Sequence, residues 1–344
     1  MKRLLASLLF VAACTGGERA NSGQCPAGEV CSPKTPNGLH FIGNQLADDL
    51  NLVGPSPTAI GGSQEVALQY DRGDGILIAL DLPFTADDEG GAGVKITATS
   101  GSVVTVTGQA SRTNYLRILD AADGTLFDRK QLTGASVDTI KLLPLNNERV
   151  PAVNSGLAWA AGPLDLGVGI YGQVQESSGP VDERLVDSSM QLDLAGATKT
   201  AWDTLHLANA QPGTSTLMVT AGDKPAAPVD VVVVASPDSI MPIDTPPWIR
   251  PNAATDLCFN TMSGGRVAIG FSWTFTADNV AVTPGLVPNC ATVTTTKTTG
   301  TVTVSATAGG QNATITLNVS NSFRESTRPR QRVLPTTAGD RAAM

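Results

Sequence analysis

The chain has 344 residues, which is too long for one ordinary domain and predicts two or three. Apolar residues make up 41% of the sequence and charged residues 16%, while glycine (35) and proline (22) are frequent. This balance favours short strands and turns over long helices. The formal net charge of −8 argues against a nucleic-acid partner, because such a partner needs a concentrated basic surface.

The chain begins with the features of a secretory signal peptide. Lys2 and Arg3 precede an apolar stretch from Leu4 to Ala13, which is too short to span a bilayer. Positive residues, a short apolar segment and small residues before a cleavage site are typical of such a signal. We therefore expect residues 1–13 to be removed and the protein to be exported.

Cys14 directly follows the apolar stretch, in the sequence VAAC at residues 11–14. These residues resemble a bacterial lipobox, in which the signal is cut just before a cysteine that carries lipid. The resemblance implies a multiply acylated amino terminus, and stable anchoring needs more than one acyl chain. Thr15 is not the aspartate that retains some lipoproteins in the inner membrane, so we expect the outer membrane, on its periplasmic or cell-surface face. The alternative is a plain signal peptide before an unmodified cysteine.

The chain has five cysteines, and an odd number in an exported protein leaves one thiol to explain. If Cys14 carries lipid, the other four fall into two local pairs, Cys25 with Cys31 and Cys258 with Cys290. An oxidising compartment would join each pair in a disulfide. The alternative for the first pair is a metal site, although no second cysteine pair or histidine cluster accompanies it.

The region after Cys14 predicts a tether followed by a first domain. Residues 14–37 are rich in Gly, Pro, Ser and Thr, which suits a tether between the lipid and the folded chain. Residues 38–147 alternate short apolar runs with turn residues, which predicts a β-sandwich-like domain. Its strand candidates lie at residues 93–101, 103–108, 114–120 and 138–145.

The second half of the chain contains an internal similarity. Segments 213–223 and 300–310 share glycine, threonine and alanine at corresponding positions. The second segment opens the clearest hairpin, in which Gly309 and Gly310 separate two runs that alternate apolar and polar residues up to residue 320. Such self-similarity is typical of tandem β-sandwich domains.

These segments resemble the closing strands of bacterial immunoglobulin-like (BIG-type) domains. The resemblance implies an all-β protein with tandem immunoglobulin-like β-sandwiches at residues 148–237 and 238–320. The proline-rich residues 235–252 predict a stiff linker that opens the last domain, and residues 321–344 predict a disordered tail.

The order of Cys258, Trp273 and Cys290 is superficially that of antibody domains, in which a disulfide bridges two sheets around a buried tryptophan. However, Cys290 precedes the strand expected at residues 300–307, which is not the usual place for the second cysteine. We therefore expect the bond between Cys258 and Cys290 to be a local variant.

Three short motifs have both a functional and an ordinary interpretation. Residues 167–172, GVGIYG, have the spacing of a dinucleotide site, but no convincing helix follows them, so a glycine-rich strand is expected. The RGD sequence at Arg72–Asp74 could bind an adhesion receptor or simply form a turn. The acidic groups at Asp71 and Asp74, at Asp87–Glu89, and at Asp120 and Asp123 could bind calcium, but they lack a full ligand set and are expected to cap turns.

No catalytic signature is present. His40 and His206 have no recognisable nucleophile or metal-ligand pattern nearby, and a strand position beside a core tryptophan is expected for His206. The sequence therefore predicts no cofactor and a non-enzymatic spacer or adhesion module, anchored to the membrane through Cys14 and possessing an extracellular protein or glycan ligand. The alternative is a carbohydrate-binding surface lipoprotein that stacks sugars on exposed aromatic rings, with Trp248 as the exposed candidate.

Overall fold

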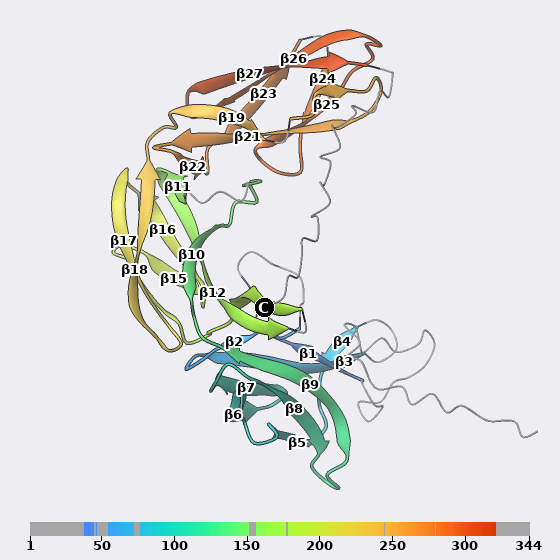
Figure 1. Cartoon of the computed structure of the whole chain (residues 1–344), viewed down its shortest axis with the longest axis vertical. Coiled ribbons are helices and arrows are strands. Elements are labelled where there is room, and N and C mark those ends of the chain that lie inside the picture. Colours follow the sequence, from blue (N-terminus) through green and yellow to red (C-terminus); the bar gives the residue numbers. More distant parts are fainter. Residues whose placement is uncertain are drawn as a thin grey trace, which may run out of the picture. The chain divides into compact units, whose positions relative to one another are not determined.

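The computed structural model describes the following residues: 38–44, 46, 54–71, 76–150, 156–176, 178–243, 245–278 and 280–320. The expected signal peptide, tether and tail lie outside these ranges, and so do Cys14, Cys25, Cys31 and the RGD sequence. Within the ranges every regular element is a β-strand (Figure 1), so the fold is all-β as the composition predicts. None of these residue ranges contains a helix that is long and apolar enough to cross a bilayer.

The chain divides into two compact units. Unit 1 runs to Asp238 and also includes Thr261–Phe271, whereas unit 2 consists of Ser239–Asn260 and the chain from Ser272. The division falls inside strand β21, Thr255–Ser263.

Unit 1 begins with a sandwich of two sheets. One sheet has the order β1-β3-β7-β6 with β4 beside β3, and the other has the order β2-β9-β8-β5 (Figure 1). The strands are β1 Leu39–Ile42, β2 Thr58–Ala59, β3 Ser63–Asp71, β4 Leu77–Ala79, β5 Phe84–Asp87, β6 Val94–Ser100, β7 Val103–Gly108, β8 Thr113–Asp120 and β9 Leu126–Ala135. The strands expected near residues 93–101, 103–108 and 114–120 are confirmed as β6, β7 and β8.

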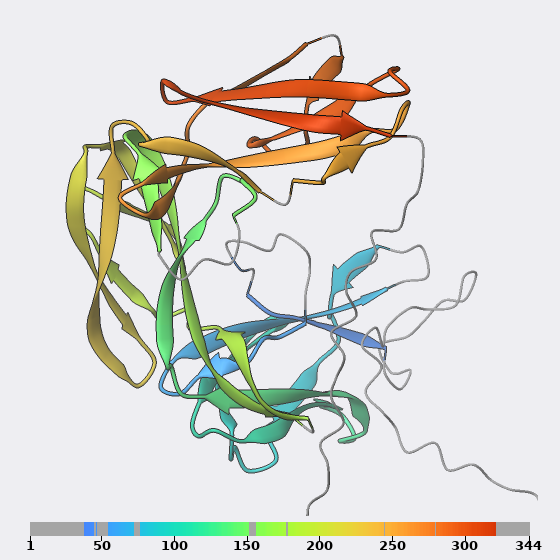
Figure 2. The same cartoon turned by 45° about the horizontal axis from the view of Figure 1, so that its top comes forward.

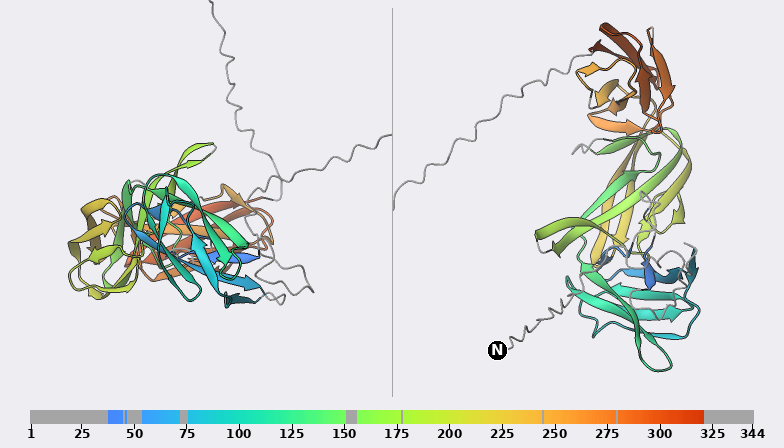
Figure 3. Two further views of the ribbon diagram at one scale, coloured as in Figure 1. Left: turned by 90° about the horizontal axis from the view of Figure 1, so that it is seen from below. Right: turned by 90° about the vertical axis from the view of Figure 1, so that its right-hand side faces the viewer.

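Alternation along these strands builds the first core. β7 buries Val104 and Val106, and β8 buries Leu116 and Ile118, while their neighbours in sequence are more exposed. A period of two places such residues on one face of each sheet, so both sheets bury an apolar face between them. β8 and β9 form the curved hairpin at one end of unit 1 (Figure 3).

Unit 1 continues with a second pair of sheets. Their orders are β10-β12-β16-β15, with β13 beside β12, and β14-β17-β18-β11-β22. The strands are β10 Thr139–Pro144, β11 Leu157–Ala160, β12 Gly162–Glu176, β13 Gly179–Leu185, β14 Gln191–Asp193, β15 Thr198–Ala201, β16 Thr204–Ala210, β17 Gly213–Ala221, β18 Lys224–Val234 and β22 Arg266–Ile269. Their shared core includes Trp159, Leu166, Ile170, Leu205 and Val219.

The GVGIYG sequence lies inside the long strand β12, so the expected glycine-rich strand is confirmed. Close packing explains two of its glycines. A Cβ on Gly167 would lie 2.9 Å from a methyl group of Leu145, and one on Gly172 would lie 2.1 Å from the carbonyl oxygen of Ser136. Larger residues at these positions would clash with the neighbouring backbone and side chains.

Hydrogen bonds join the two sandwiches of unit 1. The side chain of Asp187, in the second sandwich, accepts from the backbone N–H of Ser63 in the first at 3.1 Å and also from that of Gly222 in the second at 2.7 Å. β10, whose residues precede the expected domain boundary at 147, pairs with β12 beyond it. β10 therefore belongs to the second pair of sheets. The domain limits expected at residues 147 and 148 stay predictions.

Unit 2 has two further sheets. One contains β25 between β21 and β24, with β19 beside β21, and the other has the order β20-β27-β26-β23. The strands are β19 Ser239–Ile243, β20 Trp248–Ile249, β23 Trp273–Ala277, β24 Ala281–Pro284, β25 Cys290–Thr294, β26 Gly300–Ala308 and β27 Gln311–Val319. The predicted hairpin is confirmed as β26 and β27 (Figure 2), with Gly309 and Gly310 at positive φ in its turn.

The structure contains the predicted disulfide between Cys258 and Cys290. The two residues face each other on adjacent antiparallel strands, β21 and β25. The bond therefore lies within one sheet, whereas an antibody disulfide bridges two, and the expectation of a local variant is confirmed. Trp273 lies on the other sheet of unit 2, where it stacks on Phe275 with ring centroids 5.9 Å apart.

The segment 235–252 is more ordered than a linker. It contains β19 and β20, so its interpretation as a stiff linker is wrong for these residues. Proline is compatible with strands at sheet edges, where a missing N–H breaks no ladder bond. Trp248 on β20 is half-buried, and so are Trp202 and Trp273, so Trp248 is not the exposed tryptophan that the sequence predicts.

Candidate functional site

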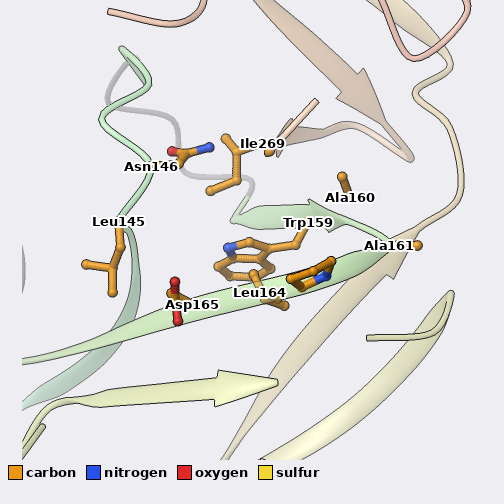
Figure 4. Close-up of a pocket in the computed structure, with 10 residues that line it drawn as sticks. Leu145, Asn146, Trp159, Ala160, Ala161, Leu164, Asp165 and Ile269 are labelled. Carbon is orange, nitrogen blue, oxygen red and sulfur yellow. The ribbon is translucent and has the colours of Figure 1, made fainter. Parts of the chain in front are cut away.

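Unit 1 contains a pocket of about 320 Å³, here called the Trp159 pocket (Figure 4). Its walls come from the end of β10, from β11, from the start of β12 and from the end of β22. The lining residues are Leu145, Asn146, Trp159, Ala160, Ala161, Pro163, Leu164, Asp165, Ile269 and Gly270. The volume is at the lower end of the range for small-molecule sites.

Strand pairing explains how these segments meet. β11 is only four residues long and lies between β18 and β22, parallel to both. Trp159 is the register partner of Val233 on one side and of Ile269 on the other. Gly162 then takes a positive φ of 124°, which lets the chain reverse into β12 and bring Asp165 to the same pocket.

Trp159 lines the pocket and is only 2% exposed. Its indole Nε1, a hydrogen-bond donor, has no acceptor. Figure 4 shows this nitrogen on the side of the ring that faces Leu145 and Asn146. A buried donor without an acceptor is destabilising by about 1–3 kcal/mol, and Trp273 Nε1 in unit 2 is in the same state.

Asp165 and His206 form a polar pair beside the pocket. They are register partners on the antiparallel strands β12 and β16, and Asp165 Oδ1 lies 2.8 Å from His206 Nδ1. The side chains are 60% and 39% exposed, respectively. The exposed carboxylate of Asp165, a lining residue, can therefore accept hydrogen bonds from a ligand. The strand position expected for His206 is confirmed.

Glu148 lies behind the pocket and is 8% exposed. Its Oε1 accepts hydrogen bonds from Asn146 Nδ2 and from the backbone N–H of Gly270, both at 2.9 Å. Burial raises the pKa of Glu148 from its ordinary value of 4.5 to about 7, against the two hydrogen bonds that lower it. These bonds join two segments of the pocket wall, those of Asn146 and Gly270.

The residues singled out by sequence motifs do not meet in this pocket. Cys258 and Cys290 lie in unit 2, and His40 lies on β1 in the first sandwich. Four of the acidic residues cap turns as expected, for example Asp120, which accepts from the N–H of Ala122 at 2.9 Å; the others are Asp87, Asp88 and Asp123. Asp71 instead ends strand β3, and Asp74 lies outside the described residues. Across the described ranges, no group of three or more His, Cys, Asp or Glu side chains is arranged to hold a metal ion.

Sequence reasoning missed the Trp159 pocket. Trp159 occurs in a short run of alanines, which predicts only a buried strand. Asp165 and His206 are far apart in the sequence and meet only through strand register. The one usable signal was the tryptophan itself, because its N–H requires a partner when the ring is buried.

No protein-family model matches the sequence, and no curated protein matches it. Among solved structures, domains 5–6 of the S-layer protein SbsC are 15% identical with a TM-score of 0.25, over 55% of this chain and 99% of that one. SGBP-B from the Bacteroides ovatus mixed-linkage glucan utilization locus, solved with a mixed-linkage heptasaccharide, is 11% identical with a TM-score of 0.26, over 82% of this chain and 70% of that one.

An endo-fucoidan hydrolase of glycoside hydrolase family 107 is 11% identical with a TM-score of 0.22, over 77% of this chain and 42% of that one. TM-scores this low do not indicate an activity or a ligand for this chain.

Proposed function

We propose that the chain is an exported, lipid-anchored protein of the bacterial envelope that binds a glycan without transforming it. The lipobox-like VAAC sequence supports the anchor at Cys14. The absence of a nucleophile or metal-ligand signature in the sequence supports a binding role over an enzymatic one. The all-β architecture is compatible with both parts of this proposal, since β-sandwiches serve widely as cell-surface domains.

The observation that carries glycan binding is the combination of apolar side chains and an exposed carboxylate in the lining of the Trp159 pocket. A sugar offers hydroxyl groups, which can donate hydrogen bonds to the carboxylate of Asp165. The apolar side chains of Leu145, Leu164 and Ile269 can cover the C–H surface of the sugar ring.

A glycan array tests this proposal directly. The full mature chain, solubilised in detergent and labelled, is expected to bind a subset of glycans and to release no cleaved product from them. Binding to none of the glycans, or turnover of a bound glycan, would contradict the proposal. Including immobilised extracellular proteins on the same array separates it from protein adhesion.

Adhesion to an extracellular protein is the second candidate, and it rests on the outer face of β26 and β27. This face carries facing hydroxyl groups, with Ser305 Oγ 3.0 Å from Thr314 Oγ1 and Thr303 Oγ1 3.4 Å from Thr316 Oγ1. Protein interfaces are depleted of charged side chains at their core, and these four residues are uncharged. Array binding to proteins alone would favour this candidate.

The anchor itself gives a separate prediction. Cys14→Ser is expected to abolish incorporation of labelled fatty acid and to move the protein out of the membrane fraction, because serine lacks the thiol that receives lipid. Metabolic labelling followed by fractionation measures both effects. Cys25→Ser is the matched control and is expected to keep the label. A Cys14→Ser protein that still carries fatty acid would show that the lipid is elsewhere.

A further inference from the structure

We infer that the side chain of Asp187 locks the two sandwiches of unit 1 into one rigid body, which unfolds as a single cooperative unit. The first sandwich contains β1 to β9, and the second contains β10 to β18 with β22. The sequence alone predicts independent domains here, at residues 38–147 and 148–237. The inference is separate from the proposed glycan binding and concerns the mechanics of the chain.

The carboxylate of Asp187 lies at the junction of the two sandwiches. Asp187 follows β13 in the second sandwich and is only 2% exposed. Its Oδ1 accepts from the backbone N–H of Ser63 in the first sandwich at 3.1 Å and from that of Ser189 at 2.9 Å. Its Oδ2 accepts from the N–H of Gly222 at 2.7 Å. A buried carboxylate is costly unless such donors surround it, so moving the sandwiches apart would remove one of its donors.

Backbone hydrogen bonds on both sides of Asp187 continue the connection. Val186 donates to the carbonyl oxygen of Pro57 at 2.8 Å, and its own carbonyl oxygen accepts from Ala59 at 2.9 Å. These two bonds form a parallel bridge between the sandwiches. Ser188 then donates to the carbonyl oxygen of Ser63 at 2.7 Å. The carboxylate is therefore part of a continuous ladder between the two sandwiches.

Glycines let the two backbones approach this closely. A Cβ on Gly62, in the first sandwich, would lie 2.5 Å from the carboxyl carbon of Asp187. A Cβ on Gly222, in the second, would lie 2.5 Å from the carbonyl oxygen of Ile60. Side chains at either position would thus separate the surfaces that the ladder joins.

Apolar packing also crosses the junction. Ala59 and Ala135, on β2 and β9 of the first sandwich, are fully buried. They belong to the same core cluster as Leu185, Val219 and Ala221 of the second sandwich. A hinge motion at the junction would expose these side chains to water, which is unfavourable.

The covalent link between the sandwiches is short and bonded along its length. Only residues 136–138 connect β9 to β10. The N–H of Asp138 donates to the carbonyl oxygen of Tyr171 at 2.8 Å, and its Oδ2 accepts from the N–H of Gln173 at 3.1 Å. The link therefore lacks the free length that a flexible linker between independent domains has.

Native-state hydrogen exchange on the full mature chain, measured at several denaturant concentrations below global unfolding, tests the inference. This measurement reports the free energy of opening of each part of a structure. We expect the core amides of β7 and β8 and those of β17 and β18 to share one free energy of opening and one denaturant dependence. Different values for the two sandwiches of the native chain would overturn the inference.

Two variants assign the coupling to Asp187. Asp187→Ala removes the acceptor, and we expect exchange in one sandwich to become at least about tenfold faster than in the other. Gly62→Ala acts from the first sandwich, because its Cβ displaces the carboxylate, and should separate the two sets of amides in the same way. Asp193→Ala removes an exposed carboxylate from β14 of the second sandwich and is the matched control, in which the sets stay together.

The variants can contradict the role of Asp187 even if one of them fails to fold. A folded Asp187→Ala or Gly62→Ala chain in which both sandwiches still open together would show that the carboxylate does not couple them. The measurement on the native chain needs no variant, so it decides on its own whether unit 1 is one cooperative body.

Discussion

Replacing Cys258 and Cys290 together with alanine is expected to lower the free energy of unfolding of unit 2 by about 3–4 kcal/mol. The disulfide closes a loop with a sequence separation of 32, and in the chain-entropy model removing it restores that freedom to the unfolded chain. The loss is a large share of the net stability of a domain. Hydrogen exchange on the full chain measures it through the amides of β21 and β25.

A matched control comes from the same pair of strands. Thr292 Oγ1 donates to Asp256 Oδ1 at 2.6 Å on an exposed face, and Thr292→Ala should cost less than about 1 kcal/mol. The native chain treated with reductant should behave like the double alanine variant, which should itself ignore the reductant. Native-like exchange protection in the double variant would show that the bond adds no stability.

Replacing Glu148 with glutamine is expected to stabilise the chain at pH 8 by up to about 3 kcal/mol and to change little at pH 5. The pKa of Glu148 rises from 4.5 to about 7 on folding, so the folded state binds more protons between these two values. Its contribution to stability is therefore complete below pH 4.5 and is lost as the pH rises through 7. Each pKa unit is worth about 1.4 kcal/mol, which gives the expected size.

Glutamine suits this test because its Oε1 can accept the same two bonds, from Asn146 and Gly270, without a charge. Thermal unfolding of the full chain between pH 5 and pH 8 measures the difference. Glu65→Gln, at an exposed position of β3, removes one carboxylate elsewhere and is the control variant with which Glu148→Gln is compared. A Glu148→Gln profile parallel to that of the native chain would show that Glu148 titrates normally.

Much of the fold could be predicted because its signals are local. Alternation of apolar and polar residues located β6, β7, β8 and the β26–β27 hairpin, since a period of two depends only on neighbouring residues. The missing helix after GVGIYG likewise identified β12 as a strand. Prolines misled the interpretation of residues 235–252, because edge strands tolerate proline.

The candidate site could not be predicted because each of its features depends on distant parts of the chain. Trp159 is buried on a short strand that lies between β18 and β22. Asp165 meets His206 through the register of β12 and β16. The elevated pKa of Glu148 results from burial, which no local pattern around it indicates.

The proposed function places a sugar in the Trp159 pocket. Nitrogen-15 NMR of the full chain, with labelled tryptophan side chains, observes the indole N–H of Trp159 directly. When a glycan that binds on the array is added, we predict that the Trp159 indole N–H resonance shifts, while that of Trp273 stays in place. A sugar that binds without moving the Trp159 resonance would contradict the account.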